Sequence, residues 1–567
     1  MYKLKPKLFS VMKNYTREQC IKDIVAGIIV AIIALPLSIA LALASGVTPE
    51  KGLYTAIVAG FVISFLGGSR VQISGPTAAF ATIVAGIVAR SGMDGLIMAT
   101  ILAGIILIII GLLRFGNLIR FIPYTITTGF TLGIAVTILI GQIKDFLGLT
   151  IPHPAVETPE KLKAVVENFH TMNWQAFLIG TISLAILVLW PKINKKIPAS
   201  LIAVIVAAVI VKLFQMNVNT IGSLYTISSK LPVPHIPAFQ ISTIRDVLPD
   251  AFTIAILAGI ESLLSCVVAD GMIGSRHRSN MELVAQGAGN LCSAIFGGIP
   301  ATGAIARTAA NIKNGGRTPV AGMVHSVVLL LILVLLMPYA ALIPMPAIAA
   351  ILFVVAYNMS EWREFAALIK TSPKSDIIVM VTTFGLTVIF DLVVAIEVGI
   401  VMAAFLFMKR MADVSDVHGW KYLDPEMEEQ EDELMDPENI RLKKVPRNTV
   451  VYEINGPMFF GAADKFMNIS LDSKVKVVIL RMRSVPAMDA NALHALKNVY
   501  RKCEKRQITL LFSHVQEQPL HMMQKAGFDQ IAGTENFCEN IDAALNRAGL
   551  LTNKRGKEQE LGREFSA

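Results

Sequence analysis

The sequence predicts a polytopic α-helical membrane protein that carries a small α/β domain at its C-terminal end. Of its 567 residues, 54% are hydrophobic and only 16% are charged, whereas a soluble domain carries about 25% charged residues. Apolar runs long enough to cross a bilayer follow one another as far as residue 408. They do not alternate as the strands of an outer-membrane barrel do. After the last run the chain becomes polar, and strand-like and helix-like segments alternate.

Two of the apolar segments, 76–89 and 302–312, are short and open with Gly, Pro or Thr, as the discontinuous helices of transporters do. Basic residues gather in alternate loops, so the positive-inside rule places both termini in the cytoplasm of a multi-pass protein of the cell (plasma) membrane. Fourteen segments are expected, at 23–44, 53–67, 76–89, 93–113, 121–143, 174–190, 198–215, 247–268, 281–297, 302–312, 318–338, 341–357, 376–390 and 392–408.

The two halves of the membrane region repeat one pattern. Pro36 in the first segment precedes the Gly/Pro-broken stretch 67–77 by about forty residues, and Glu261 in the eighth precedes the stretch 297–303 by a similar gap. Because each copy has an odd number of spans, the second copy must be inverted. We therefore expect a 7+7 inverted repeat in which spans 3 and 10 are half-helices, with a substrate site at the midplane between them.

The two broken segments are expected to bind a small anion. Helices that begin there would aim their first N–H groups and positive dipole ends at the midplane, and Arg307 would add a full charge. The alternatives are that the glycines only allow tight helix packing and that Arg307 pairs structurally with Glu261. The candidate substrate-binding residues are Gly75, Pro76, Thr77, Ala78, Thr302, Gly303, Ala304 and Arg307.

Glu261 lies within the apolar eighth segment, 247–268. A carboxylate at membrane depth costs several kcal/mol unless it is protonated, paired or wetted. It could carry the coupling proton, or it could bind Na⁺ together with Ser265 and the carbonyl groups of unwound backbone, or it could form a permanent salt bridge. We favour the proton. The sequence contains no P-loop, catalytic triad or zinc motif, so we expect no enzyme activity, no metal and no resident cofactor. The net charge of +9 sits in short loops, so no nucleic-acid partner is expected.

Beyond the membrane region (1–411) the composition changes twice. Residues 412–448 read as an acidic, solvated linker. Residues 449–551 read as an α/β domain, with strands at 449–454, 475–482 and 508–513 and helices at 489–505, 519–526 and 540–548. The last segment, 552–567, is expected to be a disordered tail.

Several motifs together resemble the sulfate permease family of anion transporters, which includes prestin and the other solute carrier 26 proteins. The resemblance covers nearly the whole chain, and the C-terminal motifs resemble a STAS domain. The motifs are Gly67-Gly68-Ser69-Arg70-Val71-Gln72-Ile73-Ser74-Gly75-Pro76-Thr77, Glu261-Ser262-Leu263-Leu264-Ser265, Gly303-Ala304-Ile305-Ala306-Arg307-Thr308, Gly456-Pro457-Met458-Phe459-Phe460-Gly461 and Val485-Pro486-Ala487-Met488-Asp489.

The resemblance implies a homodimer in the lipid bilayer that moves its anion by an elevator-like shift. It implies that spans 1–4 and 8–11 form a core and that spans 5–7 and 12–14 form a gate. Two positions depart from the family. Leu37 and Leu41 stand where many members have polar residues after Pro36, and Asp489-Ala490-Asn491-Ala492 lacks the serine of phosphorylated STAS domains.

We therefore expect a secondary active transporter of a small anion (sulfate, bicarbonate or a dicarboxylate) that works by proton-coupled symport. A sodium-coupled symporter, an anion exchanger and an anion channel are the alternatives. A nucleobase–cation symporter shares the 7+7 fold, but Arg307 and the STAS-like domain argue against it. A further alternative is a membrane sensor that signals through the STAS-like domain, although the complete pair of broken segments favours transport.

Overall fold

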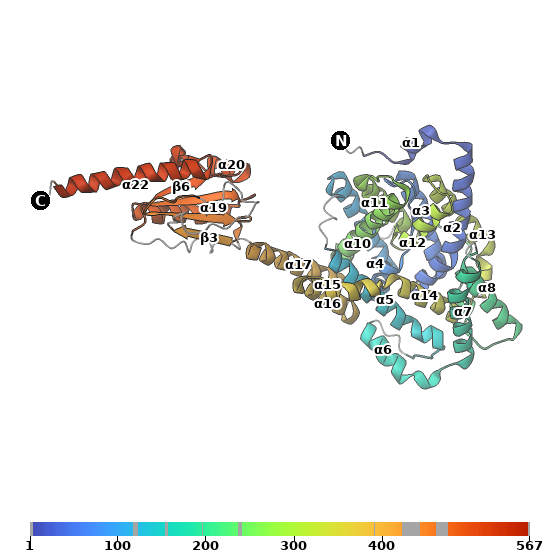
Figure 1. The fold of residues 1–567 in the computed structure, drawn as a ribbon. Coiled ribbons are helices and arrows are strands. Elements are labelled where there is room, and N and C mark those ends of the chain that lie inside the picture. Colours follow the sequence, from blue (N-terminus) through green and yellow to red (C-terminus); the bar gives the residue numbers. More distant parts are fainter. Residues whose placement is uncertain are drawn as a thin grey trace. The chain divides into compact units, whose positions relative to one another are not determined.

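A computed structural model describes residues 4–116, 123–152, 157–194, 197–235, 241–390, 392–414, 416–421, 443–460 and 474–564. The chain divides into two compact units, Met1–Ala403 and Ala404–Ala567, which are described separately below (Figure 1). The first unit is helical, and the second is built on a five-stranded sheet.

Every apolar segment predicted from the sequence coincides with a helix or with part of one. Helix length and composition alone identify 8 helices within the described residues that could cross a membrane. The helices that coincide with the predicted segments, whether or not they meet that criterion, are α2 (Arg17–Ala44), α3 (Pro49–Leu66), α4 (Ala78–Leu112), α5 (Tyr124–Leu147), α7 (Trp174–Ile193), α8 (Ala199–Leu213), α10 (Ile241–Ile273), α11 (Ser279–Ile295), α12 (Ile305–Lys313), α13 (Val320–Ala340), α14 (Met345–Met359), α16 (Lys374–Ile389) and α17 (Leu392–Val414).

Helix α4 contains two of the predicted segments because the chain bends within it at Gly92. This residue has φ 66°, a left-handed conformation that glycine adopts without a steric penalty. Shorter helices lie between the long ones: α1 (Leu8–Val11), α6 (Thr158–Glu167), α9 (Ile221–Leu224) and α15 (Trp362–Thr371). The half-helix predicted at 76–89 is therefore the first part of α4, and the one predicted at 302–312 is α12.

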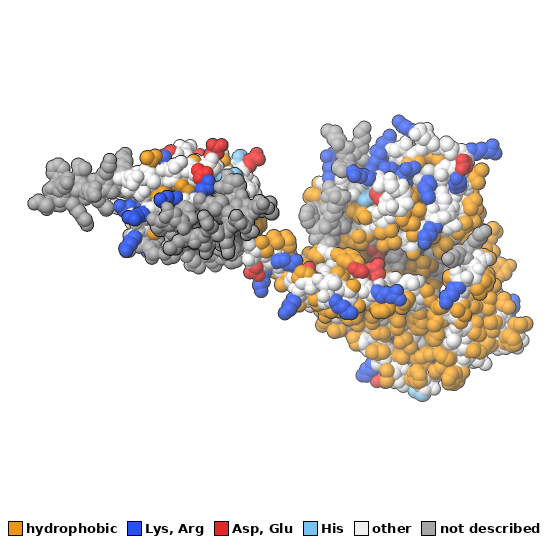
Figure 2. Space-filling view, viewed as in Figure 1, with side chains coloured by type: hydrophobic (Ala, Val, Ile, Leu, Met, Phe, Trp, Pro, Cys, Tyr) orange, Lys and Arg blue, Asp and Glu red, His pale blue; other side chains and the backbone are white. Residues whose placement is uncertain are grey.

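The long helices pack as two sets. The first set contains α2, α3, α4, α10, α11, α12 and α13, and the second contains α5, α7, α8, α14 and α16. Glycines allow close approach within each set: a Cβ on Gly287 of α11 would lie 2.5 Å from the carbonyl oxygen of Gly104 on α4, and a Cβ on Gly129 of α5 would lie 2.5 Å from that of Met380 on α16. Hydrophobic side chains cover a wide outer face of this unit (Figure 2), as a lipid-facing surface requires.

The two broken segments meet in a short antiparallel pair that the sequence did not predict. Strand β1 (Ser74–Gly75) pairs with β2 (Thr302–Gly303), with Ser74 opposite Gly303 and Gly75 opposite Thr302. Each strand leads directly towards a half-helix, β1 into α4 and β2 into α12. The pairing therefore brings the starts of α4 and α12, which are more than two hundred residues apart in the chain, to the same place.

The C-terminal unit is an α/β domain whose sheet has the strand order β3-β4-β5-β6-β7. Strand β3 runs antiparallel to β4, and the remaining neighbours are parallel. Its elements are β3 (Asp416–Lys421), β4 (Thr449–Asn455), β5 (Val477–Ser484), α19 (Ala490–Lys505), β6 (Thr509–Ser513), α20 (Glu517–Lys525), α21 (Phe528–Ala532), β7 (Phe537–Cys538) and α22 (Ile541–Glu564).

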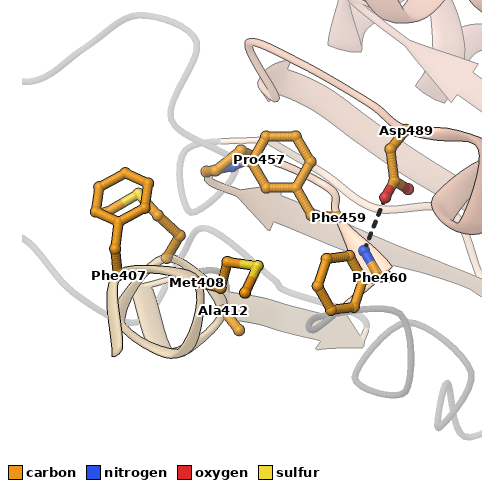
Figure 3. A pocket seen from close by; sticks show the side chains of 8 residues that line it. Phe407, Met408, Ala412, Pro457, Phe459, Phe460 and Asp489 are labelled. Atoms are coloured by element: carbon orange, nitrogen blue, oxygen red, sulfur yellow. Dashed lines mark hydrogen bonds between the residues drawn. The ribbon is translucent and has the colours of Figure 1, made fainter. Parts of the chain in front are cut away.

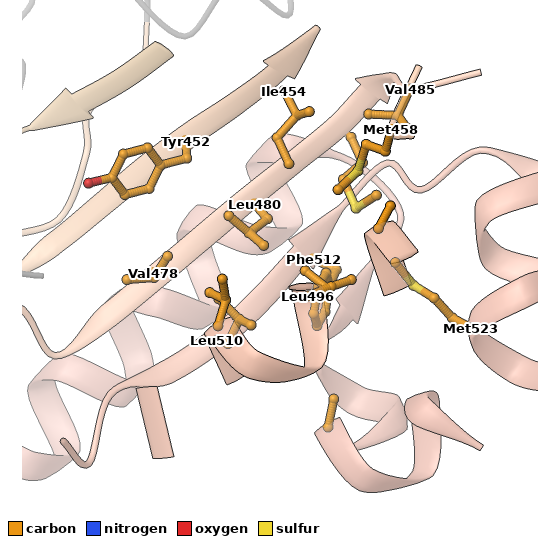
Figure 4. Packing of buried hydrophobic residues seen from close by; sticks show 14 of the residues in the cluster. Tyr452, Ile454, Met458, Val478, Leu480, Val485, Leu496, Leu510, Phe512 and Met523 are labelled. Carbon is orange, nitrogen blue, oxygen red and sulfur yellow. The ribbon is translucent and has the colours of Figure 1, made fainter. Parts of the chain in front are cut away.

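Alternate residues of the strands fill two cores. Val478, Leu480 and Phe512 pack against Leu496 and its neighbours on α19 (Figure 4). The residues between them, Ile479 among them, face Ile541, Ala544 and Leu545 on α22 instead. This period of two is the geometry of a β-strand, and it places a helix layer on each face of the sheet.

Two expectations for the C-terminal region were wrong. Part of the predicted linker forms β3, because six residues pair with the free edge of β4; residues 415 and 422–442 of that linker lie outside the described residues. Part of the predicted disordered tail is helical, because α22 continues to Glu564. Residues 552–564 contain Lys, Glu, Gln and Arg and no proline, so the helix that packs as far as Leu551 can propagate beyond its buried face.

Candidate functional site

The candidate site lies where β1 and β2 cross and the two half-helices begin. Helix α4 starts at Ala78 after Thr77, and α12 starts at Ile305 after Ala304, and neither N-cap side chain caps its helix. The first N–H groups of a helix have no partner within the helix. Two uncapped helix starts at one point therefore form a region that favours negative charge.

Gly75 and Gly303 are needed at this crossing for different reasons. A Cβ on Gly75 would lie 2.7 Å from Nη1 of Arg307, so glycine leaves the space that the guanidinium occupies. A Cβ on Gly303 would lie 2.2 Å from Nε2 of Gln72. The N–H of Gly303 donates to Oγ of Ser262 at 3.0 Å, which ties β2 to α10. Thr302 makes a second link to α10, since its hydroxyl and that of Ser262 are 2.8 Å apart.

Arg307 is the cation of the site, and it is only 2% exposed. Its Nη2 donates to the carbonyl oxygen of Pro76, while Nε and Nη1 have no hydrogen-bond partner among the described residues. A buried cation with unsatisfied donors is costly, and such groups are normally paired with an anion or hydrated. The guanidinium of Arg307, on α12, therefore contacts the segment that leads into α4 and keeps two nitrogens without a partner among the described residues.

Glu261 is half-buried on α10, and its Oε2 accepts a hydrogen bond of 3.0 Å from the hydroxyl of Thr77. No ion pair joins it to Arg307 in the part of the chain that the structure describes, so the structure gives no support to the predicted alternative of a permanent Arg307–Glu261 pair. Ser265, one turn further along α10, donates to Oγ1 of Thr308 at 3.4 Å. Glu261 and Ser265, which share Na⁺ in one of the alternatives to the proton, contact different partners.

A second carboxylate, Glu282, was not recognised from the sequence. It is fully buried on α11 and accepts hydrogen bonds from the N–H groups of Gly68 and Ser69 and from the amides of Gln72 and Gln286, at 2.8, 3.1, 2.9 and 2.9 Å. Four donors satisfy an ionised carboxylate without a cation. This network holds the loop that leads into β1, so Glu282 supports the site. An acidic residue at the start of the apolar segment 281–297 was the available signal.

Asn290 has the same role for the other broken segment. Its side-chain amide donates to the carbonyl oxygen of Ala301 at 2.9 Å, and its Oδ1 accepts from the N–H of Ala301 at 2.8 Å. This pair imitates a backbone ladder and fixes the chain just before β2. Buried polar side chains of α11 therefore hold the segments that lead into both short strands.

An apolar pocket of the C-terminal unit lies beside Asp489 (Figure 3). Oδ2 of Asp489 accepts from the N–H of Phe460 at 3.0 Å, and Oδ1 accepts from the N–H of Ala492 at 2.7 Å and so caps α19. The carboxylate is thus engaged in local structure. The pocket is lined by Phe407, Met408, Met411, Ala412, Pro457, Phe459, Phe460 and Asp489.

Comparisons with known proteins agree with this architecture. The sulfate permease family matches residues 20–383, and the STAS domain matches residues 439–544. The "Putative sulfate transporter YvdB" of Bacillus subtilis is 39% identical over 535 residues, which are 94% of this chain and 98% of that protein. The bicarbonate transporter BicA of Picosynechococcus is 31% identical over 514 residues, which are 86% of this chain and 88% of that protein.

Solved structures show the same fold. The transmembrane domain of a cyanobacterial bicarbonate transporter BicA is 30% identical, with a TM-score of 0.61 over 67% of this chain and 98% of that one. The murine solute carrier 26 family member A9 anion transporter, in its inward-facing state, has a TM-score of 0.85 over 96% of this chain and 94% of that one, at 20% identity. The chain therefore belongs to the sulfate permease family, a family of anion transporters and not of enzymes, and carries a C-terminal STAS domain.

Proposed function

We propose that the protein is a secondary active transporter that carries a small oxyanion, sulfate or bicarbonate, across the cell membrane. The observation that carries this proposal is Arg307, a buried guanidinium with two unpartnered nitrogens at the point where two uncapped half-helices begin. A bound oxyanion would supply the missing acceptors and the opposite charge. Two of the relatives are named "Putative sulfate transporter YvdB" and "Bicarbonate transporter BicA", and a dicarboxylate is a third candidate substrate.

The substrate would lie between the start of α4 and the start of α12. The N–H groups of Ala78 and its neighbours would face it from one side, and the donors of Arg307 from the other. Gly75 and Gly303 keep the backbone free of side chains at this point, so the anion can approach both strands. Thr302 and Ala304 would place the second half-helix, and Pro76 would hold the guanidinium through its carbonyl group.

Transport would proceed by movement of the first helix set, as the core, past the second set and α17, as the gate. Close glycine-mediated approaches join helices of the same set: Gly27 lies against Ala321, Gly104 against Gly287, and Gly129 against Met380. Each set is thus built to move as a body. The elevator shift, the homodimer and the cytoplasmic position of both termini are part of this proposal.

Glu261 would couple the anion to a proton. An ionised carboxylate beside the anion would repel it, whereas a protonated one would not, so protonation favours anion binding. The contact of Glu261 with Thr77 at the start of α4 supports this role, because a change in the charge of Glu261 alters the electrostatic potential at the proposed anion site. A sodium ion that neutralised Glu261 would have the same effect.

Uptake of labelled sulfate and labelled bicarbonate into proteoliposomes tests the function. Wild-type protein should take up one of them, and a pH gradient, acidic outside, should drive its accumulation. Arg307→Ala should abolish uptake, while Arg363→Ala, an exposed arginine of the same unit, should leave it unchanged. Wild-type uptake by Arg307→Ala would refute the proposed site, and uptake of neither anion by the wild type would refute the substrate.

A further inference from the structure

A histidine lies buried beside the candidate site without any hydrogen bond. His325 is on α13 and is 0% exposed, and neither Nδ1 nor Nε2 has a partner among the described residues. Buried polar side chains are hydrogen-bonded in the large majority of cases, to protein groups or to ordered water. A neutral imidazole offers one donor and one acceptor. His325 therefore presents two unused hydrogen-bonding positions in the interior of the first helix set.

The turn of α13 that carries His325 packs against the β1–β2 crossing. Its neighbour Ser326 donates to the carbonyl oxygen of Ala56 at 3.2 Å. A Cβ on Gly75 would lie 3.5 Å from Cα of Ala56 and 2.7 Å from Nη1 of Arg307. One turn earlier, a Cβ on Gly322 would lie 3.5 Å from the carbonyl oxygen of Gln72, next to β1. A Cβ on Gly60 would lie 2.9 Å from Oγ of Ser326 and 3.1 Å from the carbonyl oxygen of Ser74, which places this turn of α13 beside β1.

A purely structural role explains this arrangement poorly. A leucine or phenylalanine would fill buried space on α13 without leaving two polar atoms unsatisfied, and such a replacement is often neutral or stabilising. The same region already contains two unpartnered nitrogens of Arg307. Unsatisfied groups that gather at one point indicate a place that a ligand or an ordered water occupies in the working protein.

We propose that His325 is a further residue of the anion site and hydrogen-bonds the transported oxyanion, either directly or through one ordered water. This inference rests on the function proposed above. Arg307 supplies charge and donors only, whereas the imidazole can donate to a sulfate oxygen or accept from the O–H of bicarbonate by changing its tautomer. His325 thus adds a neutral contact that suits either oxyanion.

Two substitutions in the full-length protein separate this role from packing. His325→Leu removes both nitrogens, and His325→Asn keeps a donor and an acceptor in a smaller side chain. Leu329→Ala, at a fully buried position on the same helix, is the packing control. The measurements are the Tm without anion and the KM for uptake of labelled sulfate and labelled bicarbonate into proteoliposomes.

His325→Leu should keep or raise the Tm and should raise the KM about tenfold, the loss expected for one hydrogen bond to an anion. His325→Asn should lie closer to the wild type in KM, and Leu329→Ala should lower the Tm with little change in KM. If His325→Leu cannot be purified, His325→Phe keeps a ring and provides the same comparison.

An unchanged KM in His325→Leu for the anion that the wild type carries would overturn the inference. A KM that rises only in step with a falling Tm, in His325→Leu and Leu329→Ala alike, would also overturn it. Arg307→Ala, measured in parallel, distinguishes a failure of the proposed anion site from a failure of the histidine contact alone. If Arg307→Ala keeps the wild-type KM, the proposed site fails, whereas a defect in Arg307→Ala with a normal His325→Leu refutes the histidine alone.

Discussion

Gly75→Ala tests whether the guanidinium of Arg307 binds the anion from its observed position. The added Cβ would lie 2.7 Å from Nη1 of Arg307, and it would make an ordinary contact of 3.5 Å with Ala56. Since ordinary contacts begin at 3.4 Å, the guanidinium must retreat by about 0.7 Å. The far end of an arginine side chain can make this movement, so the fold should survive with a loss in stability of about 1–3 kcal/mol.

The displacement of the guanidinium in Gly75→Ala should weaken anion binding. A hydrogen bond to a charged group contributes about 1.5–3 kcal/mol, so its loss should weaken binding about 10- to 100-fold. The assay is the KM for uptake of labelled sulfate and bicarbonate, with the Tm as a measure of folding. Gly86→Ala is the matched control: Gly86 lies in α4, the helix that follows Gly75, and nothing lies within 4 Å of its added Cβ. Equal KM values in the two variants would refute the position assigned to Arg307.

Three further predictions concern Glu261, the C-terminal domain as a whole and Cys503 within that domain. Glu261→Gln should retain exchange of anion for anion but lose accumulation driven by a pH gradient; unchanged pH-driven accumulation would exclude the coupling role, and a dependence of wild-type uptake on sodium alone would favour Na⁺. A chain that ends near Arg410 keeps every proposed site residue, so purified truncated protein should still bind the substrate, and a complete loss of binding would show that the C-terminal domain takes part. In that domain, burial raises the pKa of the Cys503 thiol to about 11. Iodoacetamide at about pH 8.5 should therefore label Cys503 much faster in urea than in the folded protein. Because the thiol of the unfolded chain ionises first, Cys503 should lower the free energy of unfolding as the pH rises from about 8.5 towards 11.

The sequence predicted the helix boundaries at the site because those boundaries are encoded locally. Gly-Pro-Thr and Thr-Gly-Ala stand where α4 and α12 begin, and glycine and proline interrupt a helix through the conformations that they allow or forbid. The apolar residues of β4, β5 and β6 likewise predict strands from local composition. Helix starts and strands of this kind can be predicted from neighbouring residues alone, because they do not depend on residues far away in the chain.

The contacts within the site could not be predicted, because they join residues far apart in the chain. Strands β1 and β2 have two residues each, too few to show a period. Whether Arg307 contacts Glu261 or Pro76 depends on how α10 and the start of α4 are placed in space. A local sequence pattern does not predict that placement. His325 is different, because a titratable residue within the apolar segment 318–338 is a signal that the sequence already contained.

The arrangement of the two charges around α4 bears on how coupling would work. Arg307 and Glu261 both belong to the second repeat, and they contact consecutive residues of the first, Pro76 and Thr77. An anion held by Arg307 at this helix start would lie close to the carboxylate of Glu261, so its affinity must depend on whether Glu261 is charged. By thermodynamic linkage the effect is reciprocal: if a proton on Glu261 strengthens anion binding by some factor, the anion strengthens proton binding by the same factor. In this proposal neither the proton nor the anion is bound tightly alone, and the two cross together because adjacent residues just before one half-helix, Pro76 and Thr77, connect their sites.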